Sequence, residues 1–291
     1  MKKVHTRRDF IKYSSVLGAG LMLMPSCMAA SAKMATGIQL YTLRDQMAKD
    51  PSNTIEKVAS IGYKEVESAG YNGQYYGFSA KEFKKMLNEN GLKTPSGHYL
   101  TGNHAPDQQG TLINGWEQAV DDAAEVGQEY MVLAYLFDNE RETLDDYKTL
   151  IALINKSAEA CKSRGVQFCY HNHAFEFETI EGAVPYDLLL QETDPDLVKM
   201  ELDLYWTAKA NVDPVELFKE SPGRYPLWHV KDMDQAGEFA AVGTGTIDFQ
   251  RIFDHKEDSG LKHFFVEQDQ IKGDAYETIS TSYKNVNKLL S

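Results

Sequence analysis

Cysteine and positive charge are both scarce in this sequence. Three cysteines in 291 residues are too few for a disulfide framework. The deficit of Lys and Arg (30) against Asp and Glu (43) gives a net charge of −13, which argues against nucleic acid and anionic membrane surfaces as partners. The apolar run at residues 13–24 is too short to span a bilayer comfortably. With 42% hydrophobic and 25% charged residues, the composition is that of a soluble globular protein.

The amino-terminal segment has the pattern of an export signal. Its basic start contains Arg7-Arg8 followed by Phe10 and Lys12, which resembles the twin-arginine export motif. A small-x-small cleavage site fits residues 30–32, and an imperfect lipoprotein box at Cys27 makes a lipid anchor the alternative. We therefore predict that residues 1–32 are an export signal and that the mature protein is periplasmic or envelope-associated.

Strand-like and helix-like segments alternate regularly from Gly37 onward, at about thirty residues per unit. Eight strands are predicted, at residues 37–43, 63–69, 92–100, 130–136, 166–173, 198–205, 225–230 and 261–267. Eight strands alternating with eight helices are typical of a (β/α)8 barrel. A doubly wound sheet, the rival fold, normally has fewer units, and no GxGxxG follows the first strand. We predict an α/β fold with a single (β/α)8 TIM barrel over residues 35–291.

Polar residues gather at the predicted carboxyl ends of the strands, where the active site of such a barrel lies. The fifth strand ends in His171-Asn172-His173, and strand alternation places the two imidazoles on one face. Taken alone, they are equally compatible with a metal ligand and a base or with hydrogen-bonded loop residues. The other strand ends carry Glu67, His98, Glu201, Asp203, His229, Lys231 and Glu267. A divalent cation would neutralise Asp203 and Glu267 beside imidazoles, and mixed oxygen and nitrogen ligands favour manganese, zinc, cobalt or iron(II) over calcium.

The motifs at these strand ends resemble those of the xylose isomerase-like barrel superfamily, which includes sugar isomerases and epimerases, inosose dehydratases and endonuclease IV. The resemblance covers essentially the whole predicted mature chain. Its motifs lie at residues 61–67, 170–173, 201–206, 228–232, 243–248 and 265–267. It implies one catalytic divalent metal ion held at the ends of strands five to eight. The matching ligand positions in this sequence are His171, Asp203, His229 and Glu267.

The family's usual fifth-strand ligand is a glutamate, and His171 stands in its place. The two-glutamate proton shuttle of ketohexose epimerases therefore lacks one member here. The resemblance implies metal-assisted removal of the proton α to the carbonyl of a keto sugar. We expect His173 to be the base, Lys231 the acid or electrophile and Glu67 a further catalytic residue. Sugar-binding roles are predicted for His98, Trp206 and Glu201.

The outcome of this chemistry stays open. Return of the proton would make the protein an isomerase or epimerase, whereas loss of a β-substituent would make it a dehydratase or 3-keto-glycoside lyase. Because phosphorylated sugars are scarce outside the cytoplasm, export favours an unphosphorylated keto sugar or polyol ketone as substrate. An endonuclease would need more metal ligands and a basic groove, and a binuclear isomerase would want an imidazole where Trp206 stands. A non-catalytic sugar-binding barrel is the remaining alternative.

Overall fold

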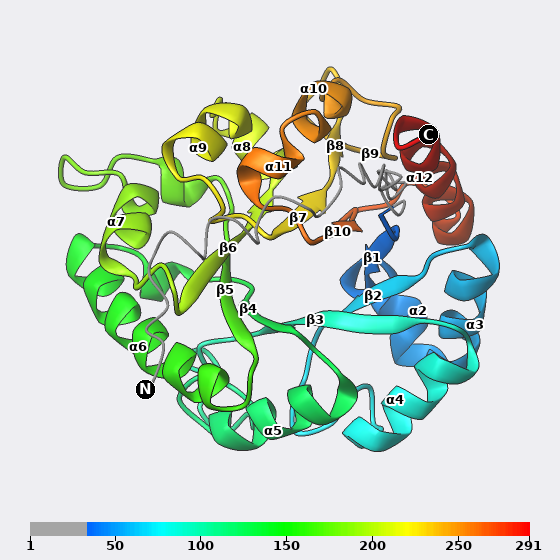
Figure 1. The fold of residues 1–291 in the computed structure, drawn as a ribbon, viewed down its shortest axis with the longest axis horizontal. Helices are drawn as coiled ribbons and strands as arrows, with labels where there is room; N and C mark the ends of the chain where they lie inside the picture. The colour runs from blue at the N-terminus through cyan, green and yellow to red at the C-terminus, as the bar shows by residue number, and fades with distance from the viewer. Residues whose placement is uncertain (1–33) are drawn as a thin grey trace, which may run out of the picture. The chain divides into compact units, whose positions relative to one another are not determined.

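The barrel is closed by eight parallel strands in the computed structural model, which describes residues 34–291. Going around the barrel, the strands follow the order β1-β10-β7-β6-β5-β4-β3-β2, so that the first and last strands pair (Figure 1). The strands are β1 (Gly37–Gln39), β2 (Glu65–Ser68), β3 (Lys93–Tyr99), β4 (Tyr130–Leu133), β5 (Gln167–His171), β6 (Val198–Asp203), β7 (Leu227–Val230) and β10 (His263–Val266). The predicted (β/α)8 fold class is confirmed.

The first and sixth strands are shorter than predicted because polar side chains end them. The side chain of Gln39 accepts a hydrogen bond from Tyr41 N, and the chain enters the 3-10 turn η1 (Leu40–Leu43) instead of extending β1. The sixth strand, predicted to reach residue 205, ends at Asp203. Its carboxylate accepts bonds from the backbone N–H groups of Tyr205 and Trp206 and caps helix α8 (Leu204–Lys209). Trp206 is therefore carried by a helix rather than by a strand.

Helices surround the barrel, and the sequence encodes their starts clearly. Ser79 with Glu82, and Thr143 with Asp146, form capping boxes at the amino ends of α4 and α6. The long helices are α3 (Pro51–Ile61), α4 (Ala80–Glu89), α5 (Trp116–Val126), α6 (Leu144–Ser163), α7 (Pro185–Glu192) and α12 (Ala275–Leu289). The shorter ones are α2 (Arg44–Lys49), α9 (Pro214–Glu220), α10 (Phe249–Phe253), α11 (Lys256–Ser259) and the 3-10 turns η2 (Asp138–Glu140) and η3 (Phe175–Phe177).

A small antiparallel pair, β8 (Asp232–Met233) with β9 (Phe239–Ala240), rises from the end of β7. The loop after β9 carries the sequence Gly243-Thr244-Gly245. Its backbone N–H groups at Gly243 and Gly245 both donate to Asp232 Oδ2, at 2.8 Å each, so a carboxylate of the chain itself occupies this turn.

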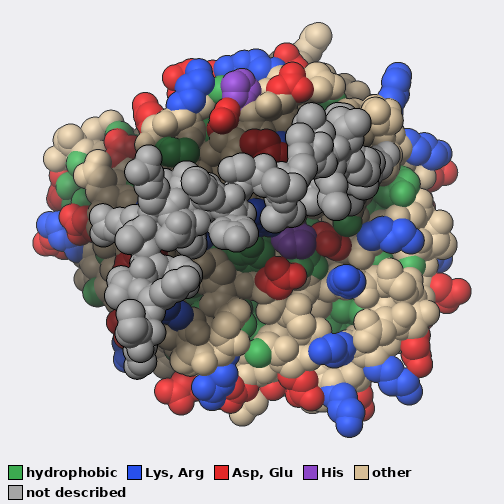
Figure 2. Space-filling model, viewed as in Figure 1, with side chains coloured by type: hydrophobic (Ala, Val, Ile, Leu, Met, Phe, Trp, Pro, Cys, Tyr) green, Lys and Arg blue, Asp and Glu red, His purple; other side chains and the backbone are tan. Residues whose placement is uncertain are grey.

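The interior of the barrel is apolar at one end and polar at the other. Val132, Cys169, Leu227 and Phe265 form a separate buried cluster inside it, whereas the polar side chains lie toward the strand ends. Cys161 and Cys169 are buried free thiols. Among residues 34–291, no helix has the length and apolar character needed to cross a membrane. The predicted export signal lies outside the described residues. Figure 2 shows acidic and basic side chains interspersed on the surface of the described residues.

Candidate active site

A pocket of about 820 Å³ opens at the carboxyl ends of the strands. Aromatic rings form much of its wall, including Tyr135, Phe175 and Trp206, and its floor includes His98 and His171. The other lining residues that matter below are Tyr41, Phe137, Arg141, His173, Lys231, Glu267 and Asp269. Flat aromatic faces combined with a few polar groups are typical of a pocket for a small polar molecule with an apolar face.

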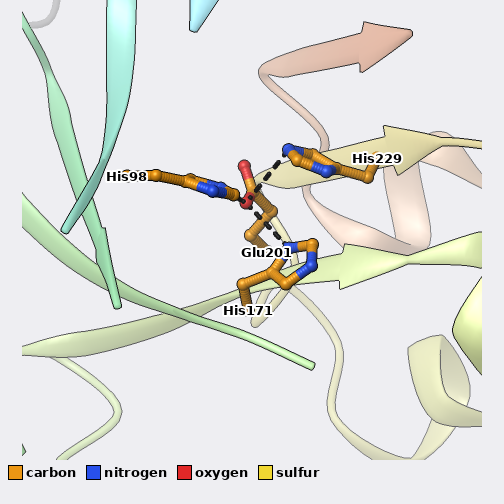
Figure 3. Close-up of side chains that lie close together, drawn as sticks. All are labelled: His98, His171, Glu201 and His229. Carbon is orange, nitrogen blue, oxygen red and sulfur yellow. Dashed lines mark hydrogen bonds and ion pairs between the residues drawn. The ribbon is translucent and has the colours of Figure 1, made fainter. Parts of the chain in front are cut away.

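Beneath this pocket, three imidazoles converge on one carboxylate oxygen (Figure 3). Glu201 Oε2 lies 2.6 Å from His98 Nε2, 3.0 Å from His171 Nδ1 and 3.2 Å from His229 Nε2. Each of the four residues comes from a different strand, namely β3, β5, β6 and β7. Glu201 and His229 are fully buried, and Glu201 Oε1 has no hydrogen-bond partner among residues 34–291.

A second carboxylate, that of Glu67 on β2, joins the same cluster. Its Oε2 lies 2.6 Å from His229 Nε2 and 3.1 Å from His98 Nε2. Gln39 Nε2 donates to the same oxygen at 2.7 Å, and Ser96 Oγ donates to Oε1. Burial alone would raise the pKa of Glu67, but the adjacent His98 and His229 lower it well below its usual value. Glu67 is thus an anion whose two oxygens are both held by hydrogen bonds or ion pairs.

A different group of charges faces the pocket. Lys231 Nζ lies 3.1 Å from Asp203 Oδ2, 2.9 Å from Glu267 Oε2 and 3.0 Å from Asp269 Oδ1. Burial would lower the pKa of Lys231, but these three carboxylates raise it well above its usual value, so the side chain is an ammonium. Burial raises the pKa of Asp203 to about 6, an effect that Lys231 only partly opposes.

His171 and His229 lie between the two groups and present one ring nitrogen to each. His171 turns Nδ1 toward Glu201, while its Nε2 is 3.7 Å from Asp203 Oδ2. His229 turns Nε2 toward Glu67 and Glu201, while its Nδ1 is 2.7 Å from Glu267 Oε2 and 4.0 Å from Asp203 Oδ2.

The histidines differ in charge because their neighbours differ. Burial, together with nearby His229, lowers the pKa of His171 well below its usual value, and burial with Lys231 does the same for His173. Burial would also lower the pKa of His98 and of His229, but adjacent carboxylates outweigh it. Glu67 and Glu201 raise the pKa of His98 to about 9, and Glu201 and Glu267 raise that of His229 well above its usual value.

His173 sits in an aromatic cage at the pocket wall. Its ring stacks on Phe175, with centroids 5.4 Å apart and planes 6° apart, and meets Tyr135 edge-on at 4.9 Å. Trp206 lies 5.2 Å away, and the same indole is 5.6 Å from Lys231 Nζ. Within the part of the chain that the structure describes, Nδ1 of His173 has no hydrogen-bond partner. Behind the cage, the buried carboxyl of Glu176 accepts a bond from His173 N at 2.8 Å, and burial raises its pKa to about 7.

Two sets of donor atoms could hold a metal ion. One comprises His98, His171, Glu201 and His229, and the other comprises Asp203, His229 and Glu267. The predicted ligands fit a cation at the second set, because His171 Nε2 also points there and Asp203 Oδ2 already faces a positive charge, that of Lys231 Nζ at 3.1 Å. Two carboxylate oxygens and two imidazole nitrogens are a donor set suited to a divalent transition metal.

The structure brings all ten predicted site residues into one region, at two depths. His98, His171, His173, Trp206, Lys231 and Glu267 line the pocket. Glu67 and Glu201, predicted to act on the substrate, are instead fully buried behind the imidazoles. Sequence reasoning missed Gln39 and Asp269 as partners of the site. Asp269 could have been found, because it follows Glu267 by two residues, the period of a strand face.

The profile of the family described as xylose isomerase-like TIM barrel matches residues 55–279. Among curated proteins, an inosose dehydratase of Geobacillus kaustophilus is 22% identical over 246 residues, covering 72% of this chain and 76% of that protein. Inosose dehydratases of other bacteria align over about half of their own length.

Solved structures resemble this chain over most of its length. A sugar phosphate isomerase/epimerase from Parabacteroides distasonis is 29% identical, with a TM-score of 0.77, and the match covers 90% of this chain and 97% of that one. The IOLI protein with a bound zinc atom has a TM-score of 0.70 at 15% identity, covering 88% of this chain and 98% of that one. At that identity the likeness shows the fold alone.

Proposed function

Because the chain belongs to the xylose isomerase-like TIM barrel family, we propose that it is a metal-assisted enzyme that enolises a keto sugar or polyol ketone. The observation that carries the proposal is the pairing of His173 and Lys231 in one aromatic pocket. The environment keeps the first neutral and the second charged, so a proton acceptor and a proton donor face the same bound molecule.

The proposed metal ligands are His171, Asp203, His229 and Glu267, with manganese, zinc, cobalt or iron(II) as the ion. A divalent ion bound there supplies a Lewis acid next to the carbonyl group of the substrate. Asp203 and Glu267 bring the negative charge that a cation requires, and both are already fixed. Asp203 is held by the backbone N–H groups of α8, and Glu267 is held by His229 and Lys231.

The chain's own residues would carry the proton. A ring nitrogen of His173 removes the proton from the carbon next to the carbonyl, and the stacked Phe175 and edge-on Tyr135 hold the ring in place. Lys231 donates a hydrogen bond or proton to the oxygen on which charge develops. Trp206 contacts both groups and offers a flat face to the sugar ring.

If the substrate carbon is reprotonated, the reaction is an isomerisation or epimerisation, which is the first candidate activity. β-Elimination is the second candidate, and a specific observation favours it. His171 stands where a second carboxylate base would be needed, while Lys231 is an acid able to protonate a departing oxygen. In that version the C–H and C–O bonds break, a C=C bond forms, His173 takes the proton and the leaving alcohol receives one from Lys231.

The proposed substrate is unphosphorylated. Barrels of this type often bind phosphate at the loops after the seventh and eighth strands. Here the carboxylate of Asp232 accepts hydrogen bonds from the backbone N–H groups of Gly243 and Gly245, so these two donors are not available to a phosphate group. The lysine and the arginine that line the pocket, Lys231 and Arg141, are both paired with carboxylates. The proposed export of the protein supports the same substrate class, because sugar phosphates are scarce outside the cytoplasm.

A 3-keto-glycoside in D2O tests the proposal. We expect metal-loaded protein to exchange the hydrogen next to the ketone for deuterium, measured by NMR, and the metal-free protein not to do so. An epimerised, intact glycoside among the products would exclude elimination, and a free alcohol with an unsaturated ketone would exclude the epimerase. Neither exchange nor turnover after metal reconstitution would refute both versions. A non-catalytic sugar-binding barrel would instead keep its affinity for the glycoside after chelation.

A further inference from the structure

The polar layer below the pocket is unusual for the interior of a barrel. That space is normally filled by branched apolar side chains, and burying charged groups is costly unless they are paired. In this protein Glu67, Glu201 and His229 are 0% exposed at this level, with Gln39 and Ser96 beside them. Glu67, Glu201 and His98 are not among the proposed metal ligands. Because burying these charged groups costs free energy, we expect their function to lie with the proposed metal ligands beside them.

We infer that Glu201 and Glu67 are positioning residues that fix which nitrogen of His171 and of His229 carries a proton. The inference rests on the proposed function, since it assumes a metal ion at His171, Asp203, His229 and Glu267. An ionised carboxylate can only accept hydrogen bonds. Therefore His171 Nδ1, 3.0 Å from Glu201, and His229 Nε2, 2.6 Å from Glu67, must both be N–H donors.

The proton positions decide where the lone pairs point. With Nδ1 protonated, His171 keeps its lone pair on Nε2, the nitrogen that lies 3.7 Å from Asp203 Oδ2. With Nε2 held by Glu67, the nitrogen of His229 that a cation would reach is Nδ1. In the metal-free protein Nδ1 faces Glu267 Oε2 at 2.7 Å and donates to it, and a bound cation would displace that proton. His171 Nε2 and His229 Nδ1 therefore both face Asp203 Oδ2, at 3.7 and 4.0 Å. This is the carboxylate–histidine–metal arrangement in which an outer carboxylate orients the ligand and raises its basicity.

The two outer carboxylates are themselves held from behind. Gln39 and Ser96 donate to Glu67, so that its oxygens cannot rotate away from His229. His98 donates through Nε2 to Glu201 at 2.6 Å and approaches Glu67 at 3.1 Å, which ties the two anions together. Its ring also stacks on that of His229, with centroids 5.0 Å apart and planes 9° apart. His98 therefore braces the layer while lining the pocket floor.

The first test is made on the unaltered protein and needs no variant to fold. Zinc-loaded, ¹⁵N-histidine-labelled protein should show His171 protonated at Nδ1 and His229 protonated at Nε2 by NMR. Assignment of the opposite nitrogen in both rings would overturn the inference, because the lone pairs would then face Glu201 and Glu67.

The second test measures zinc affinity by chelator competition in the Glu201→Gln variant. Loss of the shared anionic acceptor should weaken zinc binding by about 10- to 100-fold. Glu65→Gln is the matched control, because Glu65 is on the same strand as Glu67 and also holds a histidine, His263, at 2.8 Å. Zinc affinity of that control should stay within about twofold of the unaltered protein. Circular dichroism confirms that both variants are folded.

The third measurement distinguishes this inference from the alternative that the ion is bound by the deeper set of ligands, which includes His98. It also distinguishes failure of this inference from failure of the proposed function. His98→Ala should still bind one zinc ion, with an affinity loss below about tenfold. Loss of stoichiometric zinc in His98→Ala would show that His98 is itself a ligand and that the ion sits in the deeper set, which overturns the inference. Equal zinc affinity in Glu201→Gln and the unaltered protein would overturn it alone. An unaltered protein that binds no divalent ion would refute the proposed function as well.

Discussion

Replacing Lys231 with methionine should both destabilise the metal-free protein and tighten metal binding. The ammonium of Lys231 is 2% exposed and lies within 3.1 Å of Asp203, Glu267 and Asp269. Methionine keeps most of the length of the side chain but removes the charge. Three carboxylates would then share the site with only the imidazole of His229 to offset their charge.

The size of the effect follows from the burial of the ion pairs. Breaking a buried pair by removing one partner typically costs 3–5 kcal/mol, because the remaining charge is left uncompensated. We therefore expect the free energy of unfolding of metal-free Lys231→Met to fall by about 3–5 kcal/mol at pH 8. In the unaltered protein burial raises the pKa of Asp203 to about 6, so its carboxyl is paired with Lys231 as an anion at that pH. Zinc binding should become at least about tenfold tighter, since a competing positive charge is gone.

Urea unfolding with and without saturating zinc measures both effects. Zinc should recover most of the lost stability in Lys231→Met, whereas enolisation activity should stay lost. Lys219→Met is the control, because Lys219 pairs with Glu216 at 2.8 Å on the surface and should contribute less than about 1 kcal/mol. A loss below about 1 kcal/mol in metal-free Lys231→Met would refute the charge-compensation reasoning. If zinc stabilised Lys231→Met and the unaltered protein equally, Asp203 and Glu267 would not be the residues that hold the ion.

Three further predictions concern other groups. His173→Gln should slow deuterium exchange into the substrate by at least about 100-fold while zinc content stays unchanged, and loss of zinc would instead make His173 a ligand. Burial raises the pKa of Glu176 to about 7, so its contribution to stability is complete below pH of about 4.5 and is lost as the pH rises through about 7. Between pH of about 4.5 and about 7, the free energy of unfolding of the unaltered protein, measured in urea, should therefore fall by about 3 kcal/mol relative to that of Glu176→Gln. A difference between the two proteins that does not change with pH would contradict this. Asp232→Ala should expose the N–H groups of Gly243 and Gly245, lower the melting temperature and make it rise with inorganic phosphate, an effect that the unaltered protein should lack.

The sequence predicted the fold class and the region of the site for a simple reason. Helical and strand periodicity, with caps such as Ser79 and Thr143, are local properties that residue order alone encodes. In a barrel of parallel strands all carboxyl ends meet on one face, so residues such as His171 and Glu267 had to be neighbours once the fold was predicted. The assignment of individual roles within that region stays a prediction.

Depth and partnership could not be predicted, because they depend on where each strand stops and how the side chains turn. Strand alternation does not distinguish Glu201, which lies sealed beneath three imidazoles, from Glu267, which reaches the pocket. Spacing along the chain also cannot show that Asp232 fills the turn at Gly243 and Gly245, since that contact requires two loops to fold together. The sequence by itself therefore determined the barrel and the kinds of groups at its mouth. Only the tertiary structure decided which nitrogen of His171 and His229 faces which carboxylate, because this depends on side chains brought together from several different strands.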